Sequence, residues 1–231
     1  MRLNRFLARA GVASRRKSDS IIMSGRVAVN GEKVEELGLE VDEETDFITL
    51  NGTHLSIPST FRYLVLNKPV KVLSTVSDDR GRKTVLDLID NLAGVHPVGR
   101  LDYETSGVLL LTNDGELTYE LTHPSFGVER VYIVNLNIPF QKDHLDEIRR
   151  GVIVDDRRAN VINVEWKGGN EVKLVLAEGR NREVRKIFEQ LGYEVKMLHR
   201  ESFAGISNEG LPPGEFRDLT VKEVERLKGL D

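Results

Sequence analysis

Residues 96–117 read HPVGRLDYETSGVLLLTNDGEL, and this stretch is the most informative part of the chain. Its apolar run, residues 108–111, lies between Gly107 and the turn signal at residues 113–115. A short apolar run bounded in this way predicts a buried strand. Asp102 therefore lies on a loop just ahead of a buried strand, and loops held by a rigid scaffold are where catalytic groups concentrate.

The composition is that of a globular protein. The 231 residues, 39% hydrophobic and 30% charged, allow one large domain or one medium and one small domain. No apolar run reaches the ~18 residues of a membrane-spanning helix, and the polar, basic N-terminus lacks an apolar signal region. There is no cysteine, which excludes disulfides and thiol chemistry. We therefore expect a cytoplasmic protein.

The net charge of -4 hides an uneven distribution along the chain. Seven basic residues and one acid lie within residues 1–26, whereas eight acids and one lysine lie within residues 32–46. The basic part can bind phosphate locally, whatever the sum over the whole chain. The sequence is therefore compatible with a nucleic-acid partner.

The first fifty residues predict two helices followed by strands. An apolar face with i, i+3, i+4, i+7 spacing predicts the first helix, which Gly11 ends. Ser14 is a plausible N-cap for the second helix, which Gly25 ends. Three cations in its first turn oppose the helix dipole, and a phosphate partner would relieve that cost. The apolar face is Leu3, Phe6, Leu7 and Ala10, and the cations are Arg15, Arg16 and Lys17.

The chain after residue 127 predicts several strands and one well-defined helix. Residues 128–136 alternate in polarity and predict a strand on which Arg130 and Tyr132 share one face. The stretch EGRNREVR, residues 178–185, opens a helix that has an apolar face. Further strands are predicted at 152–154, 160–166 and 171–176, the last two joined by the hairpin turn Gly168-Gly169-Asn170.

Four strings resemble known motifs. The GRLD stretch closely resembles the second motif of the pseudouridine synthases, LNKP at residues 66–69 resembles their opening motif, and EGRNREVR resembles their third. The string RLNRFLARAGVASRRKSDSIIMSGRVAVNG resembles the small RNA-binding domain of the ribosomal protein S-four type. Together they are similar to the pseudouridine synthases that modify ribosomal RNA and carry such an N-terminal domain.

The resemblance implies a role for individual residues. Asp102 takes the place of the catalytic aspartate, Tyr132 that of the active-site aromatic residue, and Arg185 that of the basic residue that pairs with the aspartate. Leu198 matches an apolar residue that packs near the target base, although it is nearly as well explained as core. Lys68 is interpreted as a surface charge without a catalytic role. The remaining expected substrate contacts are Arg100, Arg130, Arg180 and Arg182, with Arg2, Arg5, Arg15, Arg16 and Lys17 in the N-terminal part.

The implied reaction needs neither a cofactor nor a metal. Isomerising uridine to pseudouridine breaks and remakes a bond to the ribose, with no redox change and no group lost. The sequence has no Gly-rich dinucleotide loop and no Walker loop. The adjacent carboxylates Asp78 and Asp79 lack further ligands for a metal. We therefore expect no cofactor and no metal site.

The fold class predicted is α+β. We expect a small α+β RNA-binding domain at residues 1–54, a linker at 55–60, and a catalytic domain at 61–231. The catalytic domain should hold a mixed, mostly antiparallel sheet with flanking helices.

The function predicted is isomerisation of a specific uridine in ribosomal RNA. EGRNREVR favours the large subunit, whereas LHRESFAGI and PPGEFRDLT keep the small subunit open as an alternative. A non-catalytic rRNA-binding or assembly factor is the other alternative, and a glycosidase is weakened because it usually needs two carboxylates. We expect a monomer whose partner is ribosomal RNA or a precursor of a ribosomal subunit, with no membrane.

Overall fold

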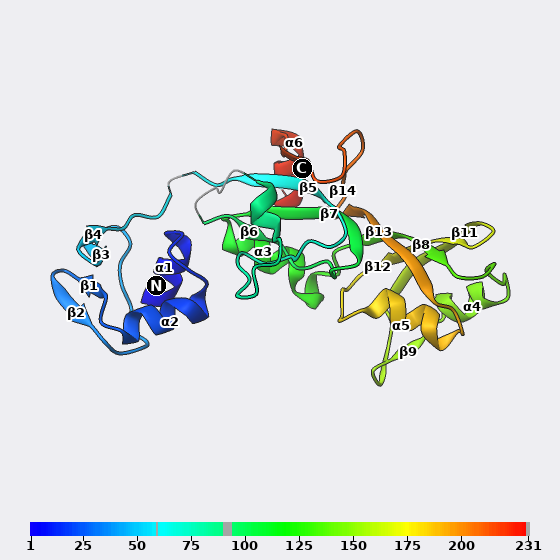
Figure 1. The fold of residues 1–231 in the computed structure, drawn as a ribbon, viewed down its shortest axis with the longest axis horizontal. Helices are drawn as coiled ribbons and strands as arrows, with labels where there is room; N and C mark the ends of the chain where they lie inside the picture. The colour runs from blue at the N-terminus through cyan, green and yellow to red at the C-terminus, as the bar shows by residue number, and fades with distance from the viewer. Residues whose placement is uncertain (59, 90–93, 230–231) are drawn as a thin grey trace. The chain divides into compact units, whose positions relative to one another are not determined.

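The computed structural model describes residues 1–58, 60–89 and 94–229. The chain forms two compact units, the first built mainly from Met1–Arg62 and the second from most of the chain after that point (Figure 1). One position of the expected linker, Ser59, lies outside the described residues. The domain bounds 1–54 and 61–231 stay a prediction.

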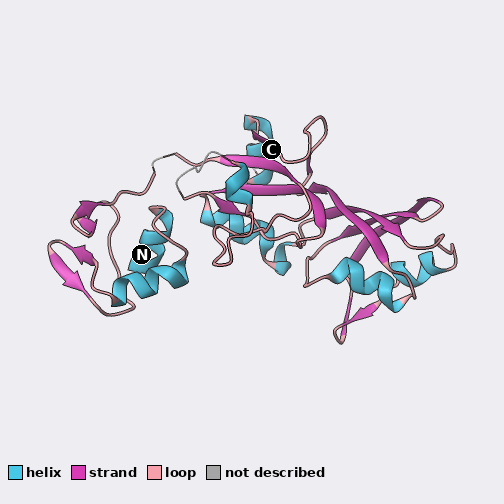
Figure 2. Ribbon diagram, in the orientation of Figure 1, coloured by secondary structure: helices cyan, strands magenta, loops and turns pink. Residues whose placement is uncertain are grey.

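The first unit combines two helices with a small antiparallel sheet (Figure 2). Its strands follow the order β2-β1-β3-β4, and neighbouring strands are antiparallel. The elements are α1 (Leu3–Arg9), α2 (Arg15–Met23), β1 (Val27–Val29), β2 (Glu32–Val34), β3 (Ile48–Leu50) and β4 (Thr53–His54).

The two helices of this unit form for the reasons that the sequence predicts. Leu3, Phe6 and Leu7 of α1 are buried in one cluster with Ile22 of α2. The Ser14 side chain caps α2 by accepting a hydrogen bond from a backbone N–H of its first turn. The predicted apolar face and the predicted cap are confirmed.

A mixed sheet of nine described strands forms the second unit. Its main path is β11-β12-β8-β13-β7-β5-β15, with β14 paired to β13 and β6 to β7. The pairs β11/β12, β12/β8, β8/β13 and β5/β15 are antiparallel, whereas β13/β7 is parallel. The predicted α+β fold with a mixed, mostly antiparallel sheet is confirmed. The strands are β5 (Tyr63–Lys68), β6 (His96–Pro97), β7 (Thr105–Thr112), β8 (Arg130–Leu136), β11 (Val161–Gly168), β12 (Glu171–Leu176), β13 (Val195–Phe203), β14 (Ile206–Ser207) and β15 (Phe216–Asp218).

Strands β7 and β8 carry the two patterns on which the prediction rests. Strand β7 is buried along almost its whole length, as its apolar run predicts. Gly107 of β7 lies opposite Arg200 of β13, and a Cβ atom there would lie 2.2 Å from the carbonyl oxygen of Arg200. Only glycine permits so close an approach. Strand β8 alternates in burial, and its buried face includes Arg130 and Tyr132.

Helices flank the sheet at several places (Figure 2). Helix α5 contacts β13 and β9 and buries Val184, Ile187 and Phe188, which confirms its predicted apolar face. None of the helices in the described ranges has the length and apolar character that crossing a bilayer requires. The remaining elements are α3 (Gly115–Thr122), α4 (His144–Arg149), α5 (Glu183–Gln190), α6 (Val221–Leu227), the 3-10 turns η1 (Val85–Leu88) and η2 (Pro124–Phe126), and the pair β9 (Ile153–Val154) and β10 (Arg157–Arg158).

Candidate active site

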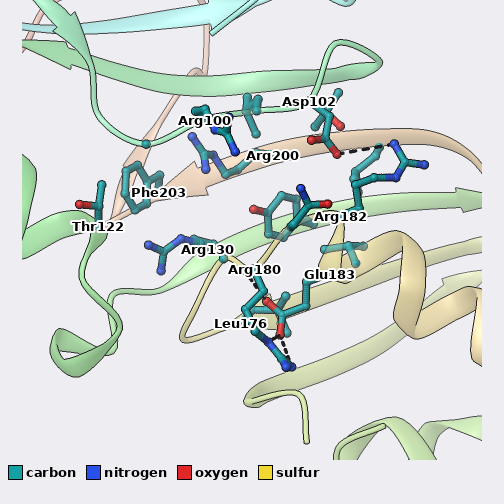
Figure 3. Close-up of a pocket in the computed structure, with 18 of the residues that line it drawn as sticks. Arg100, Asp102, Thr122, Arg130, Leu176, Arg180, Arg182, Glu183, Arg200 and Phe203 are labelled. Atoms are coloured by element: carbon teal, nitrogen blue, oxygen red, sulfur yellow. Dashed lines mark hydrogen bonds and ion pairs between the residues drawn. The ribbon is translucent and has the colours of Figure 1, made fainter. Parts of the chain in front are cut away.

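A pocket of about 240 Å³ is lined by the loop before β7, by β8 and β13, and by the loop before α5 (Figure 3). Asp102, Tyr132, Arg182 and Leu198 are among its lining residues. They come from four separate parts of the chain, so the tertiary fold brings these predicted site residues together. Three further predicted site residues line the same pocket, namely Arg100, Arg130 and Arg180.

The backbone of the Asp102 loop is held from behind by buried side chains. Lys68 Nζ donates to the carbonyl oxygens of Asp102 at 3.3 Å and Thr105 at 2.8 Å. The Ser74 hydroxyl donates to the carbonyl oxygen of Leu101 at 2.9 Å and accepts from its N–H at 3.1 Å. The loop is therefore fixed, while the Asp102 side chain itself is 39% exposed.

Lys68 is fully buried, which corrects its interpretation as a surface charge. It is the last residue of β5, and its ammonium group also donates to the carbonyl oxygen of Pro69 at 3.0 Å. The strand thus places a cation beside three backbone carbonyl groups. Burial lowers the pKa of Lys68 from 10.5 to about 8, against the opposing effect of the Asp102 and Glu104 carboxylates.

Tyr132 and Leu198 form apolar parts of the pocket wall. Tyr132 lies in the middle of β8, between Leu174 of β12 and Arg200 of β13. Leu198 of β13 lies opposite Thr105 at the start of β7. Both side chains are largely buried and both line the pocket that holds Asp102. A planar base could therefore be enclosed beside the carboxylate.

The ion pair to Asp102 comes from Arg182 and not from Arg185, which corrects the predicted pairing. Arg182 Nη1 lies 4.0 Å from Asp102 Oδ2. Arg185 instead donates to the carbonyl oxygens of Val195 at 2.8 Å and Glu104 at 3.1 Å. The reason is local geometry. Arg182 precedes α5 with a φ of 53° and lines the pocket. Arg185 lies in the first turn of α5, and its guanidinium is already bonded to the two carbonyl groups named above. Burial is the main cause that lowers the pKa of Arg185, and the positive charge of Arg182 adds to it. The Asp102 carboxylate opposes this shift.

Arg180 lines the pocket and also forms hydrogen bonds within the protein, and its predicted RNA contact stays a prediction. Its Nε donates to Glu183 Oε1 at 2.8 Å, and its Nη1 donates to the carbonyl oxygen of Val154 at 3.0 Å. Glu183 also accepts from the backbone N–H of Arg180 at 2.9 Å. This side-chain pair ties the loop before α5 to the first residue of the helix and to β9.

Arg130 is buried and bonded to the backbone although it lines the pocket, and its predicted substrate contact stays a prediction. Its guanidinium donates to the carbonyl oxygens of Val128, Leu121 and Ala177. A Cβ atom at Gly179 would lie 3.0 Å from Arg130 Nε, so the glycine of the third motif leaves room for this side chain. Arg130 therefore acts from within the pocket wall.

Arg200 and Phe203 of β13 are pocket residues that the sequence analysis missed. Arg200 is 3% exposed, and its Nε donates to the carbonyl oxygen of Val108 at 2.8 Å. The Phe203 ring packs against two guanidinium groups, Arg200 at 4.6 Å and Arg130 at 5.0 Å from the ring centroid. Arg200 is buried two residues after Leu198 on β13, but arginine is rarely buried, so its residue type did not mark it as a buried residue.

The predicted RNA-binding cations of the first unit are all exposed. Three of them occupy the first turn of α2. Exposure is what a phosphate contact requires, although contact with RNA stays a prediction. The five residues are Arg2, Arg5, Arg15, Arg16 and Lys17.

Comparison with known proteins identifies two families in the chain. Residues 62–190 match the RNA pseudouridylate synthase family, and residues 1–48 match the S4 domain. The chain is 40% identical, over 99% of its length, to ribosomal large subunit pseudouridine synthase B of Bacillus subtilis, of which it covers 96%. It is 38% identical, over 98% of its length, to an uncharacterized RNA pseudouridine synthase of Aquifex aeolicus, of which it covers 93%.

A solved structure agrees with these matches. A crystal structure of a pseudouridylate synthase aligns with a TM-score of 0.72 at 29% identity, over 98% of this chain and 99% of that one. Fold, pocket and relatives together define an RNA-modifying isomerase. The chain belongs to the RNA pseudouridylate synthase family, and the resemblance seen in the sequence is confirmed. In the described part of the chain, no three His, Asp or Glu side chains are grouped as metal ligands.

Proposed function

We propose that the protein isomerises one uridine of large-subunit ribosomal RNA to pseudouridine, with Asp102 as the reacting carboxylate and without a cofactor. One observation carries this proposal, namely the pocket in which a fixed loop presents Asp102 together with Tyr132 and Arg182. The full-length likeness to the large subunit enzyme of Bacillus subtilis favours large-subunit over small-subunit RNA.

Each pocket residue has a role in this proposal. Asp102 adds to the base or the sugar, or abstracts a sugar proton. Tyr132 stacks on the uracil after it leaves its helix, which offsets an unstacking cost of a few kcal/mol, and Leu198 packs against the same base. Arg182 orients the Asp102 carboxylate, whereas Arg185 fixes the Asp102 loop through the carbonyl group of Glu104.

The first unit is proposed to hold the RNA in register. Its exposed arginines and lysine contact phosphates, which position a nucleic acid without reading its sequence. Residues 1–54 are then the RNA-binding domain, 55–60 the linker and 61–231 the catalytic domain, in which Arg100 contacts the substrate. We further propose that the protein acts as a single chain in the cytoplasm, on ribosomal RNA or a precursor of the large subunit.

Mapping pseudouridines in ribosomal RNA from a strain that lacks the gene tests this function. One large-subunit pseudouridine should be absent, and the wild-type protein should restore it while Asp102→Asn should not. Loss of a small-subunit site instead would move the substrate to the other subunit. An unchanged map, or restoration by Asp102→Asn, would contradict the proposed reaction.

A further inference from the structure

Two buried cations, Arg130 and Arg200, line the active-site pocket, and a third, Lys68, lies against the Asp102 loop. Lys68, Arg130 and Arg200 are 0%, 6% and 3% exposed. Within the described residues, no carboxylate lies within ion-pair distance of any of them. Their N–H groups donate to backbone carbonyl oxygens instead. Buried charges are usually paired, because desolvating an unpaired ion is expensive.

Arg200 is the least satisfied of the three. Its Nε donates to the carbonyl oxygen of Val108, whereas one of its terminal nitrogens, Nη2, is buried without any hydrogen-bond partner. Burial lowers the pKa of the Arg200 guanidinium, and the Tyr132 hydroxyl beside it opposes that shift. A buried donor without an acceptor costs stability. Fold stability alone therefore does not explain an arginine at this position.

The positive charges gather on one side of the pocket. Arg130 and Arg200 lie near Phe203, away from the ion pair of Asp102 with Arg182 (Figure 3). The only other carboxylate among the described lining residues, Glu183, is bound to Arg180. The side that holds Arg130 and Arg200 is thus electropositive without a balancing carboxylate.

The proposed reaction produces a negative charge in such a pocket, and the inference rests on that proposed function. When the bond between uracil N1 and ribose C1′ breaks, its electron pair stays with the uracil ring. The resulting charge spreads over N1 and the two ring oxygens. The ring then donates an electron pair from C5 to C1′, C5 loses its proton, and N1 takes up a proton. The ring is therefore neutral in substrate and product and anionic only between them.

We propose that Arg130 and Arg200 form an electropositive floor that stabilises the uracil anion while it is detached from the ribose. Fixed charges in a water-excluded wall act strongly, because nothing has to reorganise when the anion forms. They favour the intermediate charge over the neutral substrate, so they accelerate the reaction rather than merely tighten binding. Tyr132, which stacks on the base in the proposed function, lies opposite Arg200 across β8 and β13.

A phosphate group of the RNA fits these cations less well. A phosphate is charged throughout the reaction and stays partly hydrated, so it is bound by exposed donors that reach it directly. Arg182, which is 54% exposed, and Arg100 supply such donors at the same pocket. The guanidinium groups of Arg130 and Arg200 are instead held to backbone carbonyl oxygens inside the wall.

The test compares uridine with 5-fluorouridine at the target position of the RNA. Fluorine withdraws electrons and stabilises the uracil anion by itself, so cleavage of fluorinated substrate should depend less on the floor. In single turnovers at saturating RNA, Arg200→Gln should slow cleavage of the uracil–ribose bond of uridine by about 100-fold, and the same cleavage at 5-fluorouridine by only about tenfold. Arg200→Lys keeps the charge and should keep the ratio of the two rates close to that of wild type.

The ratio of rates does not depend on the folded fraction, so it stays readable in a destabilised variant. If Arg200→Gln does not fold, Arg130→Gln provides the same ratio. Arg158→Gln is the matched control, because Arg158 also donates to backbone carbonyl oxygens but lies outside this pocket. It should leave the ratio unchanged even if it lowers the melting temperature.

Equal losses on the two substrates would overturn the inference, as would no loss at all. A loss confined to RNA affinity, with a smaller dependence on salt, would assign these cations to phosphate and would also overturn it. A wild-type protein that is inactive on ribosomal RNA would refute the proposed function itself. An active wild type with an unchanged ratio in Arg200→Gln would refute only the electropositive floor.

Discussion

The N-terminal unit and the pocket of the second unit both concentrate positive charge, but they hold it differently. The N-terminal cations are exposed, and three of them crowd the first turn of α2, where the helix dipole disfavours them. The pocket cations are buried and bonded to backbone carbonyl oxygens. Exposed cations remain screened by water and salt. The electric field of buried cations is screened much less. The exposed N-terminal cations are therefore suited to binding RNA, and the buried cations are suited to stabilising charge during the reaction.

The largest expected effect tests whether the reaction depends on the single carboxylate of Asp102. Asp102→Asn should slow isomerisation by at least about a thousandfold, because the amide is neither nucleophilic nor basic. Stability and RNA affinity should change little, since the side chain is partly exposed and its ion pair to Arg182 is 4.0 Å long. Single-turnover assays, thermal unfolding and filter binding measure the three quantities. Turnover comparable to wild type would remove Asp102 from the reaction.

The next effect separates the two arginines beside the Asp102 loop. Arg185→Ala should lower the rate about 100-fold and the free energy of unfolding by about 1–3 kcal/mol, because two hydrogen bonds to the backbone disappear. Arg185→Lys should keep only part of the rate, since a lysine cannot reproduce the planar fork. Arg182→Ala should lower the rate less and leave stability within about 0.5 kcal/mol. Single-turnover kinetics and urea unfolding measure the two effects. A larger rate loss in Arg182→Ala than in Arg185→Ala would contradict this order and would show that the Arg182 ion pair matters more to the reaction than the hydrogen bonds of Arg185.

A third prediction uses pH to test whether the buried positive charge of Lys68 affects stability and the reaction rate. The pKa of Lys68 in the folded protein, about 8, lies below the ordinary 10.5. Above pH 8 the folded protein therefore loses this cation while the unfolded chain keeps it. Stability from this group rises between pH 8 and 10.5, because the unfolded chain then binds more protons. The rate should fall over the same range as the positive field near Asp102, Glu104 and Arg200 weakens.

The matched variant for this pH experiment is Lys68→Met, which removes the charge at every pH. Its single-turnover rate should be low and should lack the alkaline decline centred near pH 8. Rates from pH 6 to 10 on one RNA, for wild type and variant in parallel, provide the comparison. An identical alkaline decline in Lys68→Met would assign it to another group.

The smallest expected effect on the reaction lies in the N-terminal unit. Replacing Arg15, Arg16 and Lys17 by Gln together should reduce the slope of log affinity against log salt by about 0.7–0.9 for each phosphate that is no longer neutralised. The saturated rate should not change, and stability should stay level or rise slightly, because cations leave a helix N-terminus. Lys222→Gln, an exposed cation of α6, is the control and should not alter the slope. A changed saturated rate with an unchanged slope would contradict the division between binding and chemistry.

The parts of the fold that the sequence predicted are those governed by local periodicity. Strand β7 followed from its bounded apolar run, α1 from its apolar face, and the cap of α2 from Ser14. The hairpin between β11 and β12 followed from its glycine turn. In each case the pattern lies within a short run of neighbouring residues, so it is visible in the sequence even though distant segments complete the sheet and the core.

The direction of charged side chains could not be predicted in the same way. Lys68 looked like a surface charge beside a proline, and Arg185 looked like the partner of Asp102, because both inferences used chain position alone. Whether a cation turns inward depends on which carbonyl groups distant segments place within its reach. For Lys68 those segments include the Asp102 loop, and for Arg130 they include the stretches around Leu121 and Ala177.

Contiguous residues were enough to specify the two-part architecture of helices and strands, the motif around Asp102 and the family, because all three are written in short stretches of sequence. Which arginine meets Asp102, and which cations are buried behind Tyr132, follows from the tertiary arrangement alone. The parallel pairing of β13 with β7, which Gly107 permits, brings Arg200 to the pocket wall. Such an arrangement depends on the alignment of strands that are about a hundred residues apart, and no local pattern encodes it.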